Sequence, residues 1–284
     1  MFNKIYQKLF RFLITRNIFD VFLGRMLFGN DSTFSKNIQE HIVLFKNKKK
    51  FLISENKNLK INGFEIVKDA VSRELIQNLK IKFNKEIKLK EVELKKNLRF
   101  DFSSINNPYF FNKFHETKII FNQKLHQILE NYYSGNFEIC NVHLYRILKN
   151  EKTNSKDLES YGSTISWHND GSRADSLKIF ISLEKIDEDG GPMEFINKKE
   201  TKAIFKSSLF NINKIRIAKK IESKNIIKKM TFADNEAYII NTNHCLHRAQ
   251  SPIKGYRDLL VYYCRSSSNP FNGRWEEIAT QQIY

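Results

Sequence analysis

Apolar and polar positions follow two different periods along the chain. After a turn at Asn62-Gly63, a short strand is predicted over residues 64–67. Apolar residues then recur at helical spacing, which predicts a helix over residues 73–96 and a second helix over 118–132. Beyond these helices the helical period fades. Short β-prone runs follow over residues 138–148, 163–167, 177–183, 194–196, 237–241 and 259–264.

Helices followed by several short strands indicate an α+β protein whose second half is a β-sandwich or barrel. We expect an N-terminal segment with its linker over residues 1–60 and a folded domain over 61–284. Over residues 1–29, apolar residues at helical spacing are interrupted by Lys and Arg. Two interpretations fit this pattern: a basic amphipathic helix on a membrane face, and a helix that packs on its own domain. Arg11 and Arg16 break up the apolar stretch that a secretory signal would have.

Composition and charge narrow the range of protein classes. Of the 284 residues, 41% are hydrophobic and 28% are charged, which is typical of a globular protein. The three cysteines are widely spaced and fit no zinc pattern, so we expect a reducing, cytoplasmic setting without disulfides. The net charge of +17 is concentrated in residues 1–60 and 198–229. Several interpretations of these two stretches remain open. One is contact with a polyanion or a membrane surface, and another is a compositional bias that leaves the lysines solvated. For residues 198–229, a lid is a further interpretation.

Candidate metal ligands lie in the β-rich half. His168 and Asp170 are two positions apart at the end of a predicted strand, so their side chains would share one face. A second imidazole is offered by His244 or His247, and Arg257 follows them in the chain. Two histidines and one carboxylate, with the remaining positions open, suit a non-haem Fe(II) ion and its oxygen chemistry. A guanidinium can hold a carboxylate through two hydrogen bonds, as a dicarboxylic cosubstrate would need.

From Gly63 to about Arg265 the chain resembles the phytanoyl-CoA dioxygenase family of Fe(II)/2-oxoglutarate oxygenases. The segments that carry the resemblance are the Gly63-Phe64 turn with its helix, Trp167-His168-Asn169-Asp170, the acidic turn ending in Gly190-Gly191-Pro192, and His247-Arg248-Ala249 with Arg257. The resemblance implies a double-stranded β-helix (a jelly roll, or cupin-like fold) with flanking helices, mainly N-terminal. It also implies that His168, Asp170 and His247 bind Fe(II) and that Arg257 holds the distal carboxylate of 2-oxoglutarate.

The resemblance further implies a reaction with O2 that hydroxylates an aliphatic carbon of a small or carrier-bound molecule and releases succinate and CO2. Because Asp170 is retained, the chain is similar to hydroxylases rather than to related halogenases, which have a small residue there. Tyr145 and Lys178 are expected to contact the cosubstrate or the substrate, and Arg146, the neighbour of Tyr145, is a further candidate. A surface or core role remains open for all three. Departures from the family pattern lie at Ala233-Asp234-Asn235 and at Asn241, none of which is an expected ligand.

Two other functions remain open. An oxidative demethylase that acts on nucleic acid would use the basic stretches, but the excess charge lies in two separate segments rather than over the whole chain. We therefore expect small-molecule partners rather than nucleic acid. The second alternative is a jelly-roll module that binds without turnover, and the intact ligand set with Arg257 argues against it. The other histidines, His143 among them, are expected to be structural.

Removing residues 1–29 tests the membrane interpretation. If the segment is a basic amphipathic helix on a membrane, the shortened protein should bind anionic vesicles more weakly, because apolar insertion and electrostatic attraction are both lost. Turnover of 2-oxoglutarate should be retained. Equal sedimentation of both proteins with anionic vesicles would instead favour a helix that packs on its own domain.

Overall fold

The computed structural model describes residues 57–89, 104–106, 113–133, 135–149, 166–170, 175–206, 221–233, 235–267, 269–273, 275 and 278. Nearly all of the predicted N-terminal segment 1–60 lies outside these ranges, as do residues 207–220 of the stretch considered for a lid. The predictions on membrane contact and on a lid therefore stay predictions. Within the described ranges, no helix is long and apolar enough to cross a membrane.

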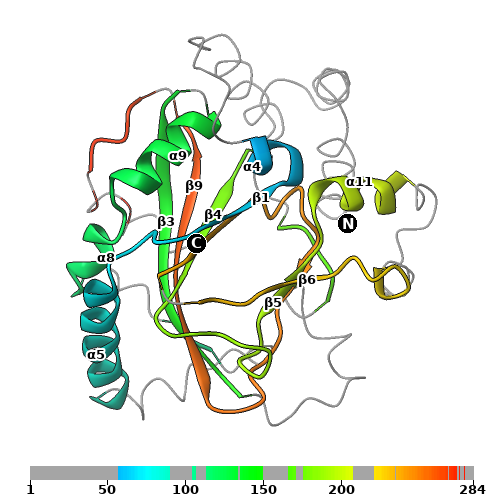
Figure 1. Ribbon diagram of the computed structural model, residues 1–284. Coiled ribbons are helices and arrows are strands. Elements are labelled where there is room, and N and C mark those ends of the chain that lie inside the picture. The colour runs from blue at the N-terminus through cyan, green and yellow to red at the C-terminus, as the bar shows by residue number, and fades with distance from the viewer. Residues whose placement is uncertain are drawn as a thin grey trace, which may run out of the picture.

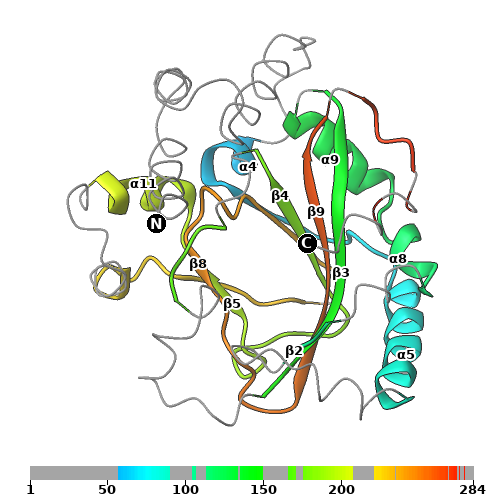
Figure 2. The same ribbon diagram turned by 180° about the vertical axis from the view of Figure 1, so that it is seen from behind.

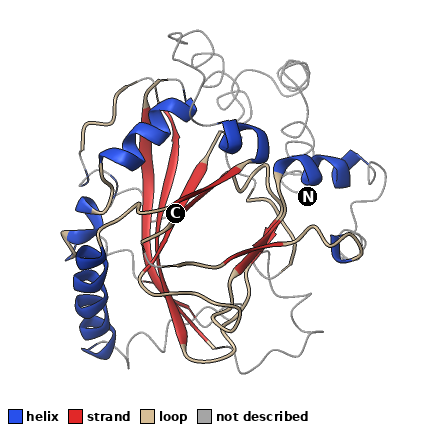
Figure 3. Ribbon diagram, in the orientation of Figure 1, coloured by secondary structure: helices blue, strands red, loops and turns tan. Residues whose placement is uncertain are grey.

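Two antiparallel β-sheets form the centre of the described structure (Figure 1). The smaller sheet has the order β6 (Lys228–Met230), β5 (Met193–Phe195), β8 (His247–Arg248). An isolated bridge between His168 and His247 adds the segment around His168 to its edge. Figure 3 shows this sheet lying across from the larger one. The larger sheet has the order β1 (Phe64–Val67), β7 (Ala237–Ile240), β4 (Leu177–Ser182), β9 (Tyr256–Ser266), β3 (Phe137–Leu148), β2 (Ser104–Asn106).

Helices cover the side of the larger sheet that faces away from the smaller one. In Figures 1 and 2, α5 (Arg73–Leu89), α8 (Glu116–Ile119) and α9 (Gln123–Tyr133) lie along the outer side of β3 and β9. α4 (Lys57–Asn62) precedes β1 and contacts α11 (Lys198–Lys206). Helices together with antiparallel sheets confirm the α+β prediction.

Several predicted elements have different ends in the structure. The helix predicted over 73–96 is α5, and residues 90–96 lie outside the described ranges. The helix predicted over 118–132 is interrupted, because Asn122 caps a new one: its Oδ1 accepts hydrogen bonds from the N–H groups of Lys124 and Leu125 at 3.0 and 3.2 Å. The described end of the strand predicted over 163–167 is a bend. The short elements β2, β6, β8 and α11 were not predicted.

Alternation along the strands gives the larger sheet two different faces. On β4, Leu177, Ile179 and Ile181 belong to the core under the helices, whereas Lys178 and Phe180 face the smaller sheet. β9 behaves in the same way. Its helix-side residues include Leu260, Tyr262 and Cys264, and its opposite face carries Arg257, Leu259 and Tyr263.

A β-bulge decides which residues of β3 face the smaller sheet. The register between β3 and β9 shifts between Ile139 and Asn141, so Cys140 is an extra residue on β3. Before the bulge Ile139 lies on the helix side, and after it Leu144 does. Tyr145 is thereby turned to the opposite face. In a regular strand of the same sequence without a bulge, Tyr145 would share the face of Ile139 and point toward the helices.

Arg146 lies on the helix side and forms a buried ion pair. It sits opposite Asp258 of β9, and its Nε and Nη2 donate to the two carboxylate oxygens at 2.7 and 2.6 Å. Nη2 also donates to Asn84 of α5, and the guanidinium lies 3.6 Å from the centroid of the Tyr256 ring. Of the roles that the sequence left open for Arg146, the structure therefore shows the core role, because strand alternation points this side chain to the face opposite that of Tyr145. Arg146 instead attaches α5 to the sheet.

Asp258→Ala should destabilise the protein by about 3–5 kcal/mol, because Arg146 would keep a buried charge without its carboxylate. Urea unfolding followed by circular dichroism measures this change. The matched control is Lys254→Ala, which removes a lysine whose side chain is 82% exposed. The control should hardly change the free energy of unfolding. Similar, small effects of both variants would contradict a stabilising role for the buried pair.

Candidate active site

A cavity of about 200 Å³ lies between the two sheets. Part of its wall is apolar and includes Phe180 from the larger sheet and Met193 and Met230 from the smaller one. The structure brings six of the residues that the sequence singled out for the site into this cavity, whereas Arg146 and His244 are not among its described lining residues. The six residues are Tyr145, His168, Asp170, Lys178, His247 and Arg257.

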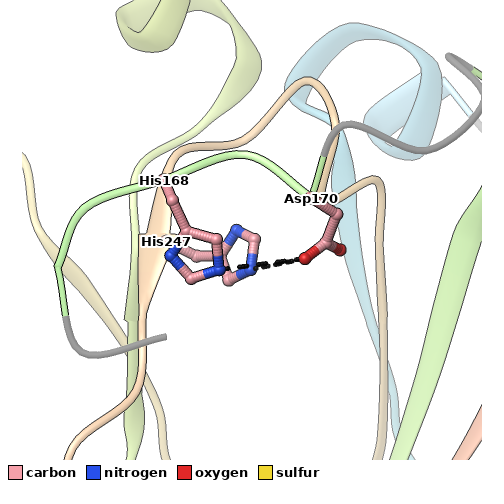
Figure 4. A group of neighbouring side chains, drawn as sticks. All are labelled: His168, Asp170 and His247. Carbon is pink, nitrogen blue, oxygen red and sulfur yellow. Dashed lines mark ion pairs between the residues drawn. The ribbon is translucent and has the colours of Figure 1, made fainter. Parts of the chain in front are cut away.

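His168, Asp170 and His247 form one group of candidate metal ligands (Figure 4). Their donor atoms all lie within 4.8 Å of one another. Oδ1 of Asp170 is 3.4 Å from Nε2 of His247 and 3.8 Å from Nε2 of His168. Both rings point their Nε2 atoms toward the carboxylate, so one ion can contact all three side chains. Two imidazoles and one carboxylate on one side of an ion leave its other positions open, an arrangement that suits Fe(II).

The backbone pairs the two histidines. The N–H of each residue donates to the carbonyl oxygen of the other at 3.0 Å, so both side chains leave the bridge on the same face. Nδ1 of His168 lies 2.8 Å from the carbonyl oxygen of Ser166, and Nδ1 of His247 lies 3.1 Å from that of Cys245. A proton on each Nδ1 makes these hydrogen bonds and leaves Nε2 as the ligand atom. Burial, together with the neighbouring His247, lowers the pKa of His168 to about 3, which keeps its imidazole neutral.

Two glycines pack the loops beside the histidines. Gly63 has a φ of +79°, and a Cβ added there would lie 2.6 Å from Sγ of Cys245. The Gly63 carbonyl also accepts a hydrogen bond from the N–H of Asn241 at 2.8 Å. Gly191 has a φ of +67°, and an added Cβ would lie 2.4 Å from the carbonyl carbon of Ser251. Two of the segments that carry the sequence resemblance, those with Gly63 and Gly191, thus require glycine for close backbone packing.

The turn before His247 explains why Asn241 is compatible with the site. Oδ1 of Asn241 accepts hydrogen bonds from the N–H groups of Asn243 and His244 at 3.1 and 3.0 Å. An asparagine oxygen serves this turn as an aspartate oxygen would. His244 is not among the described residues that line the cavity. Of the two candidate histidines, the structure therefore brings His247 to the site.

Side-chain contacts brace the strands behind the two histidines. The guanidinium of Arg248, which follows His247, lies 4.8 Å from the ring of Trp167, which precedes His168. Nε of Arg248 donates to Oε2 of Glu194 on β5 at 2.6 Å. The bridge between the histidines is therefore supported by a second layer of contacts on its other side.

Lys178 forms an ion pair with the candidate carboxylate ligand. Its Nζ lies 2.7 Å from Oδ2 of Asp170 and 4.8 Å from the centroid of the Tyr263 ring. Burial opposes ionisation of Asp170, but the charge of Lys178 holds the pKa of this carboxyl well below its usual value. Burial likewise disfavours the ammonium, but Tyr263 and Asp170 raise the pKa of Lys178. Both groups therefore remain charged.

Arg257 is a buried cation that faces the cavity. Its side chain is buried, with a residue exposure of 2%, and neither Nε nor Nη1 has a hydrogen-bond partner among the described residues. Burial lowers the pKa of Arg257 to about 10, so the guanidinium is still charged at neutral pH. Asp170 is the one carboxylate among the described cavity residues, and it is already paired with Lys178. The unmet hydrogen-bonding capacity of Arg257 therefore fits an anionic ligand.

Sequence reasoning missed two polar residues of the cavity. His143 was expected to be structural and Tyr263 was not considered, yet both line the cavity, and their ring centroids lie 5.1 Å apart. Strand alternation could have found His143, because it lies two positions before Tyr145 and shares its face. The same period places Tyr263 on the face of Arg257.

Comparisons with known proteins show likeness in structure only. No family model matches the chain, and no curated protein is similar to it in sequence. The chain shares its fold with AviO1 from Streptomyces viridochromogenes Tue57, at 13% identity and a TM-score of 0.52, covering 75% of this chain and 94% of AviO1.

Two further solved structures are similar to this chain. The non-haem α-ketoglutarate-dependent epimerase SnoN from nogalamycin biosynthesis matches at 11% identity and a TM-score of 0.47, covering 78% of this chain and 85% of SnoN. HygX from Streptomyces hygroscopicus, with nickel, 2-oxoglutarate and hygromycin B bound, matches at 10% identity and a TM-score of 0.46, covering 75% of this chain and 86% of HygX.

Alanine substitution of the two neighbouring histidines tests the ligand set. His247→Ala should abolish tight binding of Mn(II) or Fe(II), because one of three ligand atoms is lost. His244→Ala is the matched control and should bind the ion as the wild type does, since this side chain is not among the described residues of the cavity. Anaerobic isothermal titration measures both affinities. Loss of binding in His244→Ala with retention in His247→Ala would reverse the assignment.

Proposed function

We propose that this protein is an Fe(II)/2-oxoglutarate-dependent dioxygenase related to the phytanoyl-CoA dioxygenase family. The observation that carries the proposal is that one cavity is lined by a His/Asp/His group and by a buried guanidinium whose Nε and Nη1 have no partner among the described residues. The two facing antiparallel sheets support a double-stranded β-helix as the fold of the domain over residues 61–284. His168, Asp170 and His247 are the proposed ligands of Fe(II).

The charges of the cavity suit 2-oxoglutarate. Lys178 and Asp170 compensate each other, which leaves Arg257 of the larger sheet as the remaining permanent cation among the described lining residues. A dicarboxylate can place one end at the ion and its distal carboxylate on the guanidinium, where two parallel hydrogen bonds are available. The apolar wall, with Phe180 and Leu259, can contact the methylene groups between these ends and exclude water.

The candidate site residues have different tasks in this proposal. His168, whose imidazole is neutral, and His247 each present Nε2, and Asp170 presents Oδ1. Burial raises the pKa of Tyr145, so its hydroxyl keeps its proton and can donate to the cosubstrate. When bound, Fe(II) and 2-oxoglutarate supply the oxidising chemistry for a reaction with O2 that yields succinate and CO2.

The proposed reaction is hydroxylation of an aliphatic carbon in a small or carrier-bound molecule. Retention of Asp170 at the metal group supports a hydroxylase rather than a halogenase. The test is Fe(II)-dependent formation of succinate with a panel of metabolites, read by mass spectrometry, with His168→Ala as the inactive control. A wild-type protein that neither binds 2-oxoglutarate in the presence of Fe(II) nor forms succinate would favour a binding module. Salt-dependent binding of DNA or RNA would favour the demethylase alternative.

Substitution of Arg257 separates a 2-oxoglutarate enzyme from other metalloproteins with two histidines and an aspartate. Arg257→Ala should weaken 2-oxoglutarate binding about a hundredfold, because a pair of charge-assisted hydrogen bonds contributes about 3 kcal/mol. Affinity for the metal ion alone should stay nearly unchanged. Arg257→Lys should recover only part of the loss, since an ammonium lacks the planar fork.

The matched control for this experiment is Arg265→Ala on the same strand, where Arg265 pairs with Glu138 on neighbouring β3. This variant should bind 2-oxoglutarate as the wild type does. Anaerobic titration of the metal-loaded proteins gives the affinities. Equal affinity in the wild type and Arg257→Ala would show that the distal carboxylate binds elsewhere.

A further inference from the structure

The two oxygens of Asp170 have different partners. Oδ1 faces the histidines, at 3.4 Å from Nε2 of His247. Oδ2 faces Nζ of Lys178 at 2.7 Å. One oxygen of the carboxylate therefore faces the candidate metal position, and the other faces the ammonium.

The two partners of this ion pair are held by different kinds of structure. Lys178 lies on β4, which is paired on both sides, with Ile240 of β7 and Tyr263 of β9 as its register neighbours. Its side chain is 16% exposed and passes over the ring of Tyr263. Asp170 lies on a segment outside the named strands, and its N–H reaches the carbonyl oxygen of Thr242 at 3.4 Å. The rigid partner of the pair is thus Lys178.

We propose that Lys178 is a positioning residue that binds Oδ2 of Asp170, so that only Oδ1 is presented to the metal ion. The inference rests on the proposed function and assigns Lys178 a different task from the direct cosubstrate contact expected from sequence. A carboxylate with both oxygens free can bind an ion through both and occupy two positions. With Oδ2 held by the ammonium, Asp170 occupies one position, and three remain for ligands from outside the chain.

The ion pair also sets the charge of the cavity. Among the described lining residues, Asp170 is the one carboxylate and Lys178 and Arg257 are the two permanent cations. Because Lys178 is committed to Asp170, Arg257 remains the cation available for a distal carboxylate. Positioning of the ligand and selection of the cosubstrate are therefore assigned to different side chains.

The test measures metal affinity without cosubstrate. Lys178→Met keeps an unbranched side chain, one heavy atom shorter, and removes the ammonium. It should weaken binding of Mn(II) by about 10–100-fold, as loss of a partner of a metal ligand does. Lys178→Arg keeps a cation that can hold Oδ2 and should recover part of that affinity. The matched control is Lys198→Met, which removes a partly buried lysine that donates to the carbonyl oxygen of Lys60. The control should bind Mn(II) as the wild type does.

The outcomes separate this inference from the proposed function. A wild type that binds neither Mn(II) nor 2-oxoglutarate would overturn the proposed function itself. Wild-type binding together with unchanged Mn(II) affinity in Lys178→Met would overturn the role of Lys178 alone. If Lys178→Met lost affinity only for 2-oxoglutarate, Lys178 would contact the cosubstrate directly, which also contradicts the proposal. Should Lys178→Met fail to fold, Lys178→Gln is titrated instead, and its affinity for Mn(II) should lie below those of the wild type and Lys178→Arg; an affinity equal to that of the wild type would overturn the role of Lys178.

Discussion

The larger sheet is covered on both faces, by helices on one side and by the smaller sheet on the other, and the site depends on this condition. A strand in such a sheet sends alternate side chains into two interiors. Leu177 and Ile179 fill the core under the helices, while Lys178 between them reaches the cavity. The bulge at Cys140 changes the alternation along β3, and as a result Tyr145 points toward the cavity. Packing of apolar side chains on one face of the sheet thus fixes the positions of the cavity side chains on the other face.

The same strands show how a buried charge is treated on each face. Asp258 and Arg146 meet on the helix side, where each satisfies the other and Asn84 adds a further hydrogen bond. Arg257, the neighbour of Asp258, is equally buried on the cavity side, but two of its nitrogens have no partner among the described residues. An unpaired buried charge costs stability. This cost is tolerated on the cavity side because an anionic ligand can supply the missing hydrogen bonds.

The sequence predicts the larger elements well because their apolar pattern is long and regular. β3, β4 and α5 lie where the pattern indicates, and β9 begins before its predicted run because Tyr256 and Arg257 also pair with β3. Short elements such as β8 carry too few residues for a period to be read. The cavity residues His168 and Asp170 were found from spacing, whereas His247 and Arg257 needed the resemblance to a family. For Arg146 the sequence left cosubstrate contact and a core role open, and strand alternation places it in the core, because neighbouring residues of a strand point to opposite faces.

The three candidate ligands are held in two independent ways. His168 and His247 are fixed to each other by a pair of backbone hydrogen bonds, which involve no side chain. Asp170 lies outside the named strands, and its carboxylate is held through Lys178, a side chain from the opposite sheet. The imidazole pair therefore belongs to the smaller sheet, whereas the position of the carboxylate depends on an ion pair with the larger sheet. Because the ligands and Lys178, the ion-pair partner of Asp170, together span both sheets, the geometry of the site depends on how the two sheets face each other. An ion that binds all three ligands would stabilise this arrangement in turn.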